Sequence, residues 1–433
     1  MRNASLWRDL LGVENTVIED VDFDEVSEVS EVVVVHVRPR RARSGRCGSC
    51  GSRAGWYDRG EGRRRWRGLD LGTMQVFLEA DAPRVNCATH GPTVRQVPWA
   101  RHGAGHTHRF DQQVAWLATQ CSKSAITQLM RIAWRTVGAI ITRVRGETAA
   151  GIDAFAGLRR IGIDGISYKR NHKYLTVVVD HDSGRLVWAS PGRDRATLHR
   201  FFDALEESGE GRCAQITHVT ADGADWIADV VGKRCPQAIR CADPFRVVGW
   251  ATDALDAVRR DAWNQVRRAG HTRTHGWGGG RSLTVATGPA RMLKHARFAL
   301  WKNPENLTDH QRVKLEWIAK TDPRLYRAYL LKEGLRTIFK LPAADAAEAL
   351  DRWIAWARRC RIESFVRLQA RIVHYRAEIL AAIEHGLSNG LIESVNTKIR
   401  LIARLAFGFK SPEALIALAM LNLGGHRPVL PGR

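Results

Sequence analysis

The stretch of sequence that decides the fold is Arg160-Ile-Gly-Ile-Asp-Gly-Ile166, followed by Lys173-Tyr-Leu-Thr-Val-Val-Val179 and Arg185-Leu-Val-Trp188. Short apolar runs with short connections predict three strands in series. Beyond them the pattern alternates, with helices expected over 195–207, 224–232 and 245–260 and strands over 215–220 and 238–241. Strands in series followed by alternating helices and strands predict an α/β fold, in which helices cover the faces of a mixed sheet.

Two aspartates stand at strands of this region. Asp164 lies inside the first strand, and Asp222 directly follows the fourth. A carboxylate beside an apolar strand is costly unless it is paired or binds a metal ion. Two alternatives remain open: Asp164 and Gly165 could form a hairpin turn, and Asp222 could cap the next helix. For the first, Lys169-Arg-Asn-His172 is the better turn, which favours keeping Asp164 in the strand.

A third carboxylate, Glu393, lies in Ser388-Asn-Gly-Leu-Ile-Glu-Ser-Val-Asn-Thr-Lys-Ile-Arg400. At helical spacing Asn389, Glu393, Asn396 and Arg400 share one face, for which a solvated helix surface is the alternative explanation. Hard cations such as Mg²⁺ or Mn²⁺ take oxygen ligands. Three carboxylates from separate segments can hold two such ions about 4 Å apart for an in-line displacement at a phosphodiester.

Four potential zinc ligands occur as the two pairs Cys47-Gly-Ser-Cys50 and Cys87-Ala-Thr-His90. The two-residue spacing lets both members of a pair reach one ion, so we predict a structural Zn²⁺ on Cys47, Cys50, Cys87 and His90. The metal would supply folding energy to a small Arg-rich ribbon that lacks a core. A chance Cys-x-x-Cys beside an unrelated Cys and His is the alternative.

A DNA-binding segment is predicted from two short helices, Ser122–Met130 and Trp134–Arg145, with Ser122 as the N-cap of the first. The second helix would present Arg135, Thr136, Arg143 and Arg145 beside an apolar stripe. This layout is typical of a helix-turn-helix whose second helix enters a DNA groove. Arg131 stands where the turn usually has glycine, and a plain helical hairpin is the alternative.

Composition agrees with a nucleic-acid partner. The 433 residues include 67 Lys and Arg against 45 Asp and Glu, a net charge of +22. Such a charge predicts a polyanionic partner, either nucleic acid or an anionic membrane surface. No apolar run reaches the 18–20 residues of a membrane span, and residues 1–31 lack the apolar core of a signal peptide. Eight scattered cysteines are too few for a disulfide scaffold, so we expect a reducing, cytoplasmic location.

Taken together, these motifs resemble bacterial insertion-sequence transposases of the ISL-three family, from about Cys47 to Leu423. The resemblance rests on the zinc pairs, the helical DNA-binding segment, Ile161-Gly-Ile-Asp-Gly165 with His172-Lys-Tyr174 and Val177-Val-Val-Asp180, and, most specifically, Ser388–Ile399 with Ala406-Phe-Gly-Phe409. Two positions differ from the usual family pattern. An acid often follows the first Asp, where this chain has Gly165, and Asp-x-Phe-His is common where it has Asp243-Pro-Phe-Arg246.

The resemblance implies a ribonuclease H-like catalytic core, in which the first and fourth strands lie side by side and bring Asp164 and Asp222 together. It implies that Asp164, Asp222 and Glu393 form the catalytic, magnesium-binding triad. The expected domains are an acidic N-terminal segment at 1–37, a zinc-binding ribbon at 38–105, a helix-turn-helix domain at 106–150, a ribonuclease H-like core at 158–245 and 386–426, and a helical insertion at 246–385. Residues 270–281, within the insertion, are expected to form a mobile loop, and its tryptophans are expected in the core rather than stacked on bases.

The expected function is that of a DNA transposase that binds terminal inverted repeats and catalyses metal-dependent cleavage and strand transfer into target DNA. We expect a homodimer on double-stranded DNA, no membrane partner, and a nucleoid-associated location in the cytoplasm. The expected DNA contacts are Arg63, Arg64, Arg65, Arg135, Thr136, Arg143, Arg145, Lys398 and Arg400. A non-catalytic repressor derived from a transposase, or another ribonuclease H-like nuclease, is the alternative.

Overall fold

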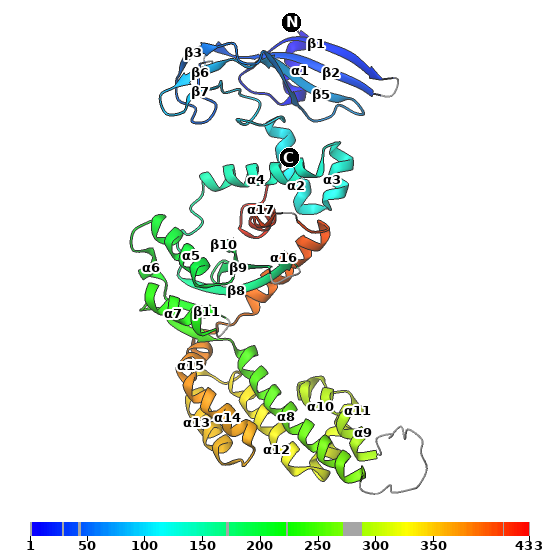
Figure 1. The fold of residues 1–433 in the computed structure, drawn as a ribbon, viewed down its shortest axis with the longest axis vertical. Helices are drawn as coiled ribbons and strands as arrows, with labels where there is room; N and C mark the ends of the chain where they lie inside the picture. Colours follow the sequence, from blue (N-terminus) through cyan, green and yellow to red (C-terminus); the bar gives the residue numbers. More distant parts are fainter. Residues whose placement is uncertain are drawn as a thin grey trace. The chain divides into compact units, whose positions relative to one another are not determined.

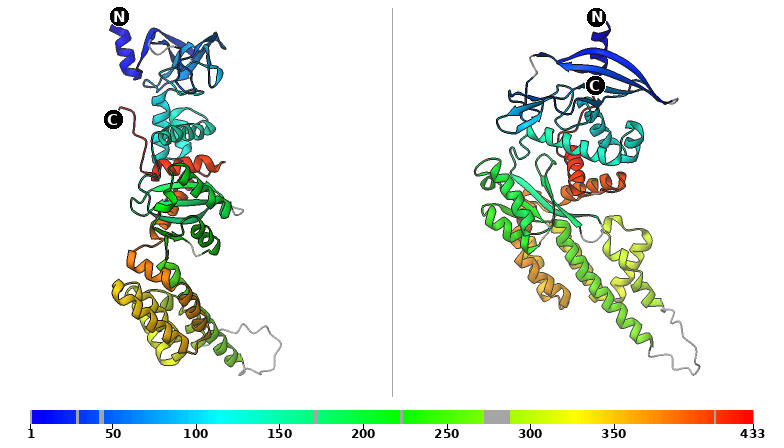
Figure 2. Two further views of the ribbon diagram at one scale, coloured as in Figure 1. Left: turned by 90° about the vertical axis from the view of Figure 1, so that its left-hand side faces the viewer. Right: turned by 45° about the horizontal axis from the view of Figure 1, so that its top comes forward.

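The computed structural model describes residues 2–27, 30–41, 45–169, 173–221, 224–271, 288–409 and 411–432. The chain divides into two compact units, Met1–Ala154 with Ile399–Arg433, and Phe155–Lys398 (Figures 1 and 2). The first unit carries the cysteine pairs and the expected helix-turn-helix. The second carries the expected catalytic strands and the long helical stretch.

The β-rich part of the first unit contains two sheets. Its elements are α1 (Arg2–Leu11), β1 (Thr16–Ser27), β2 (Ser30–Pro39), β3 (Gly55–Asp58), β4 (Arg63–Arg67), β5 (Gln75–Asp81), β6 (Arg84–Cys87) and β7 (Gly91–Val94). The strands pair in the orders β1-β2-β5-β4 and β3-β6-β7. The valine run predicted as a strand forms β2, and Val33, Val35 and Val37 are buried with Trp66 and Trp99.

The helical part of the first unit is built from α2 (His108–Gln120), α3 (Lys123–Met130), α4 (Trp134–Ala150) and α17 (Pro412–Leu423). The predicted N-cap is confirmed, because the Ser122 hydroxyl accepts a hydrogen bond from the Ala125 amide at 3.2 Å. Arg131 takes the left-handed conformation (φ 51°) at the turn where glycine is usual. The apolar side of α4 is buried, and α17 packs against α4 and α2.

A five-stranded mixed sheet forms the centre of the second unit. Its strands are β8 (Arg160–Lys169), β9 (Lys173–Asp180), β10 (Leu186–Pro191), β11 (His218–Ala221) and β12 (Ile239–Ala242), in the order β10-β9-β8-β11-β12. β9 is antiparallel to β8 and β10, whereas β11 is parallel to β8 and β12. The predicted mixed sheet is confirmed, although β11 begins later than expected because residues 212–215 form a short helix.

Helices cover both faces of this sheet (Figure 1). Apolar side chains of β8, among them Ile161 and Ile163, are buried in one core with α5 (Arg195–Glu207), α6 (Arg212–Gln215) and α7 (Asp225–Arg234). On the opposite face lies the first half of α16 (Gly390–Leu405), since a side chain at Gly162 would collide with Ile392. α16 begins in the second unit and continues into the first.

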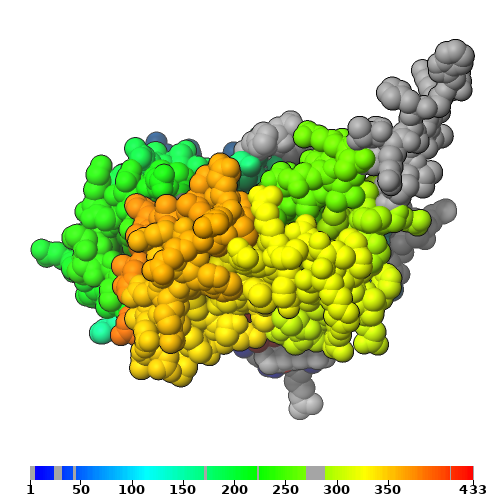
Figure 3. All heavy atoms as spheres, turned by 90° about the horizontal axis from the view of Figure 1, so that it is seen from below, coloured from blue at the N-terminus to red at the C-terminus, as the bar shows by residue number. Residues whose placement is uncertain are grey.

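Between β12 and α16 the chain forms a helical bundle, as predicted. Its elements are α8 (Pro244–His271), α9 (Gly288–Lys294), α10 (Arg297–Trp301), the 3-10 turn η2 (Pro304–Asn306), α11 (Asp309–Thr321), α12 (Pro323–Ile338), α13 (Ala343–Arg359), α14 (Glu363–His374) and α15 (Arg376–His385). Figure 3 shows this bundle from its end, with the yellow and orange helices in close contact. The expected loop at 270–281 lies, from residue 272 on, outside the described residues.

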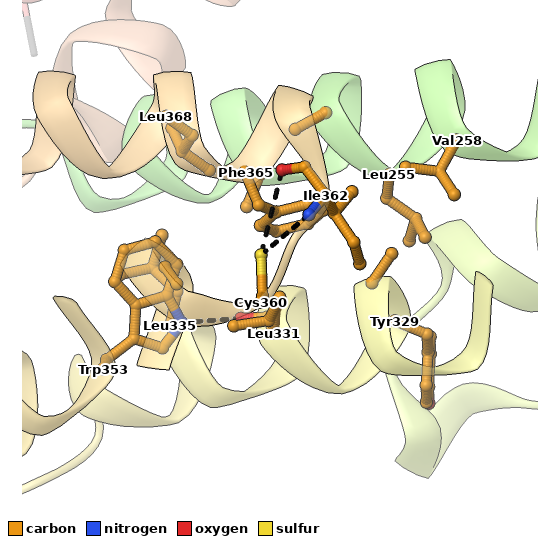
Figure 4. Close-up of a cluster of buried hydrophobic side chains, with 14 of the residues drawn as sticks. Leu255, Val258, Tyr329, Leu331, Leu335, Trp353, Cys360, Ile362, Phe365 and Leu368 are labelled. Carbon is orange, nitrogen blue, oxygen red and sulfur yellow. Dashed lines mark hydrogen bonds between the residues drawn. The ribbon is translucent and has the colours of Figure 1, made fainter. Parts of the chain in front are cut away.

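The bundle has its own hydrophobic core, which explains most of its aromatic residues. Side chains from α8, α12, α13 and α14 point towards one another in Figure 4. Trp353 is buried and donates its indole N–H to the Leu331 carbonyl at 2.8 Å. Trp301 and Trp317 pack against the same core, whereas Trp356 is 40% exposed. The core assignment is therefore confirmed for these three tryptophans.

Candidate catalytic and metal sites

Asp164 lies in the interior of the central strand β8, where it pairs with Val177 of β9. The hairpin-turn alternative is wrong, because Gly165 also pairs within the strand, with Thr176. The Asp164 carboxylate is half-buried, and each oxygen accepts one hydrogen bond. Oδ1 accepts from the Gly165 amide at 2.7 Å, and Oδ2 accepts from Asn396 Nδ2 at 2.7 Å.

The Asn396 contact connects β8 to the helix that carries Glu393. Asn396 is 2% exposed and Asn389 is 8% exposed, so a solvated helix face is the wrong explanation for these two residues. Glu393 precedes Asn396 by three residues on α16, and its side chain is exposed. The face predicted from helical spacing therefore has a buried part that holds Asp164 and an exposed carboxylate one turn away.

The fourth strand of the sheet lies beside the first, as the family resemblance implied. The parallel pairing of β11 with β8 runs from His218↔Arg160 to Ala221↔Ile163. The next residue along each chain is an aspartate, Asp164 in β8 and Asp222 after β11. Asp222 itself lies outside the described residues. The N-cap of α7 is Ala224, so Asp222 does not hold the capping position that the alternative reading gave it.

Asp243 joins the helical bundle to the catalytic helix. It follows β12 and is 7% exposed. Its Oδ2 accepts a hydrogen bond from the Arg246 amide at 3.1 Å, which caps the start of α8. Its Oδ1 accepts a hydrogen bond from the Asn389 amide at 3.1 Å, just before α16 begins. Sequence reasoning noted this carboxylate without finding its role, because its two partners are 143 residues apart in the chain.

The four predicted zinc ligands converge on one point. The ligand atoms of Cys47, Cys50, Cys87 and His90 all lie within 4.8 Å of one another. The Cys50 and Cys87 sulfur atoms are 3.7 Å apart, and His90 Nδ1 lies 3.8 Å from Cys47 Sγ. Tetrahedral zinc with Zn–S bonds near 2.3 Å gives edges of about 3.8 Å. The spacing and the donor set therefore fit a zinc ion without rearrangement.

Local backbone geometry prepares this cluster for metal. Gly51 (φ 73°) and Gly91 (φ 64°) provide the left-handed turns that close the two ligand loops. The amide of His90, followed by that of Thr89, lowers the pKa of the Cys87 thiol to about 7. A thiol with this pKa is readily deprotonated at neutral pH, which is the form that binds zinc.

Residues predicted to contact DNA differ in their surroundings in the second helix of the helix-turn-helix. Arg135 is exposed in the first turn of α4, and Thr136 is half-buried. Arg143 Nη1 instead donates a hydrogen bond at 2.9 Å to Asp111, whose side chain is fully buried. Burial lowers the pKa of Arg145. α4 therefore offers Arg135 to solvent, whereas Arg143 is bound inside the domain.

The other expected DNA contacts lie on β4 and α16. On β4, Arg63 and Arg65 pair with Glu79, and Arg64 donates a hydrogen bond to the Ala104 carbonyl at 2.8 Å. Lys398 and Arg400, on α16, are both exposed. In the part of the chain that the structure describes, no helix is long and apolar enough to cross a membrane.

Comparisons with known proteins match all three regions of the chain. Residues 161–419 match a family described as transposase, residues 95–145 match the helix-turn-helix domain of transposase family ISL3, and residues 43–90 match the zinc-finger of transposase IS204/IS1001/IS1096/IS1165. Transposases for insertion sequence element IS1557 from two strains of Mycobacterium tuberculosis are each 65% identical over 440 residues, covering 100% of this chain and 98% of theirs. The transposase for insertion sequence element IS1001 of Bordetella parapertussis is 26% identical over 353 residues, which is 81% of this chain and 82% of that protein.

Proposed function

Because the chain belongs to the ISL3 (ISL-three) family of transposases, we propose that it cuts and joins DNA at the terminal inverted repeats of a bacterial insertion sequence. The relatives from Mycobacterium tuberculosis are transposases and align along the whole chain. The helix-turn-helix region and the net charge of +22 agree with a DNA substrate. Its place of action is then the nucleoid.

One observation carries the catalytic part of the proposal. The hydrogen bond from Asn396 to Asp164 ties the central strand of the sheet to the helix of Glu393. In the proposed ribonuclease H-like core, β8 and β11 are the adjacent first and fourth strands, so Asp164 and the residue after Ala221 belong to neighbouring strand ends. Asp164, Asp222 and Glu393 are the proposed catalytic triad.

The triad fits divalent cations such as Mg²⁺ or Mn²⁺, because all its donors are carboxylate oxygens. When bound, two such ions supply Lewis acidity at the phosphate and lower the pKa of the attacking water or 3′-hydroxyl. The chain's own part is to hold the carboxylates in place. Asn396 orients Asp164, and each Asp164 oxygen keeps a lone pair for a second partner. Asp243 fixes the start of the helix that carries Glu393.

DNA binding is proposed for the first unit. Cys47, Cys50, Cys87 and His90 would hold a structural Zn²⁺ that keeps the ribbon folded. Arg135, at the start of α4, is placed where a recognition helix contacts base edges. Transposition joins two ends of one element, so we propose that two copies of the chain assemble on DNA.

The test uses duplexes of the element's own terminal repeat, labelled on each strand, with Mg²⁺. We expect wild-type protein to cut at the repeat boundary, and Asp164→Asn to bind the same duplex but cut it at least about 10³-fold more slowly, since several kcal/mol of transition-state stabilisation are lost. Binding without cutting by the wild type would favour a repressor. Cutting that ignores the repeat would favour another kind of nuclease.

A further inference from the structure

Three arginines gather at the edge of the sheet where β8, β11 and β12 have their carboxyl ends. They are Arg193, which precedes α5, Arg246 in the first turn of α8, and Arg371 on α14. We call them the arginine cluster. Arg246 lines a cavity of about 300 Å³ together with Asp243 and Trp250, and the Arg371 guanidinium stacks on the Trp250 ring at 3.7 Å from its centre. In open α/β sheets this edge is where ligands commonly bind.

Arg193 is held in place by the strands beneath it. A Cβ atom added at Gly165 would lie 2.8 Å from both Cδ and Nε of Arg193, so this side chain runs directly across the bare glycine. Its guanidinium lies over the Tyr174 ring, 5.4 Å from the centre. The loop behind it is fixed to β9, because the Gly192 amide donates a hydrogen bond to the Tyr174 carbonyl at 2.9 Å. The side chain of Arg193 is nonetheless exposed, so its charge is available to a ligand.

The cluster concentrates positive charge beside the catalytic aspartate. Burial first, and then the positive charge of Arg371, lower the pKa of Arg246, with Arg193 acting in the same direction and Asp164 opposing it. Like charges so close together repel one another unless an anion joins them. Two of these features fall where the chain differs from the usual family pattern, since Gly165 replaces an acid and Arg246 replaces a histidine.

We propose that the arginine cluster binds backbone phosphates of the DNA strand next to the scissile bond, and that Gly165 leaves the space that Arg193 needs. The inference rests on the proposed transposase function and adds the residues that grip the strand at the catalytic edge. Arginine suits this task because its planar fork donates two parallel hydrogen bonds to one phosphate. An acid at position 165 would both collide with Arg193 and neutralise it.

The test is a double-mutant cycle of Gly165→Ala and Arg193→Ala, measured as the single-turnover cleavage rate of the terminal-repeat duplex at saturating protein. Each single variant is expected to lower the rate about 10-fold or more, as loss of a charged hydrogen bond does. Gly165→Ala should have little further effect in the Arg193→Ala background, because its damage acts through Arg193. The matched control is Arg195→Ala, an exposed neighbour paired with Asp229, which should leave the rate unchanged.

A second readout does not depend on cleavage. Affinity for the same duplex is measured against salt concentration with Ca²⁺ in place of Mg²⁺, for the wild type and for Arg193→Ala, Arg246→Ala and Arg371→Ala. Each of the three losses should lower the slope of log affinity against log salt by about one. Fully additive rate losses in the cycle, or slopes equal to those of Arg195→Ala, would overturn the proposal. A wild type that does not cut would refute the transposase function, while the slopes would still decide whether the cluster binds DNA.

Discussion

The cysteine cluster and the Asp164 centre are both predicted metal sites, yet they are built in opposite ways. In the cysteine cluster all four ligand atoms already lie within 4.8 Å of one another on two tight loops. At the Asp164 centre one carboxylate is fixed by Asn396, and Glu393 extends into solvent from its helix. Structural zinc sites use every coordination position for protein ligands, whereas catalytic sites keep positions open. The difference teaches that preorganisation here goes to the ion that supports the fold, and access goes to the ions that meet DNA.

The largest expected effect comes from breaking the closed site. Cys47→Ser, or removal of zinc by a chelator, should unfold the ribbon, because structural zinc supplies about 10 kcal/mol or more of folding free energy. We expect loss of one bound zinc per chain by metal analysis and loss of terminal-repeat binding. Cys121→Ser, a cysteine outside the cluster, is the matched control and should keep both. A ribbon that stays folded without zinc would make the two sites alike.

The next effect concerns the buried ion network that supports α4. Asp111 is fully buried and accepts hydrogen bonds from Arg101 and Arg143. Asp111→Ala should lower the free energy of unfolding by about 3 kcal/mol, because it leaves these cations without their carboxylate. Urea unfolding measures the loss. Glu147→Gln, which alters an exposed partner of Arg101, should cost less than about 1 kcal/mol. Equal costs would show that Asp111 does not organise the domain.

A smaller effect is expected when the open site loses its support. Asn396→Ala should slow cleavage about 10- to 100-fold, which is typical for a residue that orients a metal ligand. It should also raise the Mg²⁺ concentration needed for half-maximal rate, while binding of the terminal repeat stays unchanged. Thr397→Ala, an exposed neighbour on α16, serves as the control. If the rate falls with no change in Mg²⁺ dependence, Asn396 supports only the fold.

The smallest effect is a pH dependence of the DNA-binding unit. Burial, followed by the charges of Arg143 and Arg67, lowers the pKa of His106 to about 4. The unfolded chain, with a histidine pKa near 6.5, binds more protons between these values. Stability from this residue is therefore complete above about pH 6.5 and is lost as the pH falls towards 4.

For this comparison we use His106→Phe, which keeps an aromatic ring against Phe110. Between pH 7.5 and 5 the wild type should lose about 1 kcal/mol more than the variant, a figure reduced because the ring keeps some contact with solvent. Burial raises the pKa of the neighbouring Asp111, which acts in the opposite sense in both proteins. Parallel melting temperatures for wild type and variant across this range would contradict the assignment.

Local signals made much of the fold predictable. The strands β8, β9 and β12 and the helices of the bundle follow from apolar periodicity, and the ends of α3 follow from Ser122 and the residue at the turn. The cysteine cluster was predictable because each pair sits within one loop. In these cases the decisive residues lie within a few positions of one another.

Long-range contacts were not predictable in the same way. Asn396 and Asp164 are separated by 232 positions, and helical spacing indicated only that Asn396 shares a face with Glu393. The contact of Arg193 with Gly165 had only a weak signal, the absence of a side chain after Asp164. Arg143 was predicted to face DNA because helical position does not reveal a buried partner on another helix. Its partner, Asp111, lies 32 residues away on α2.

The most direct test of the central claim is anomalous diffraction from crystals of the protein bound to a terminal-repeat duplex, grown with Mn²⁺. The account predicts manganese peaks within coordination distance of Asp164, Asp222 and Glu393, beside the scissile phosphate. Peaks elsewhere, or a Glu393 carboxylate that contacts no manganese while DNA is engaged, would contradict it.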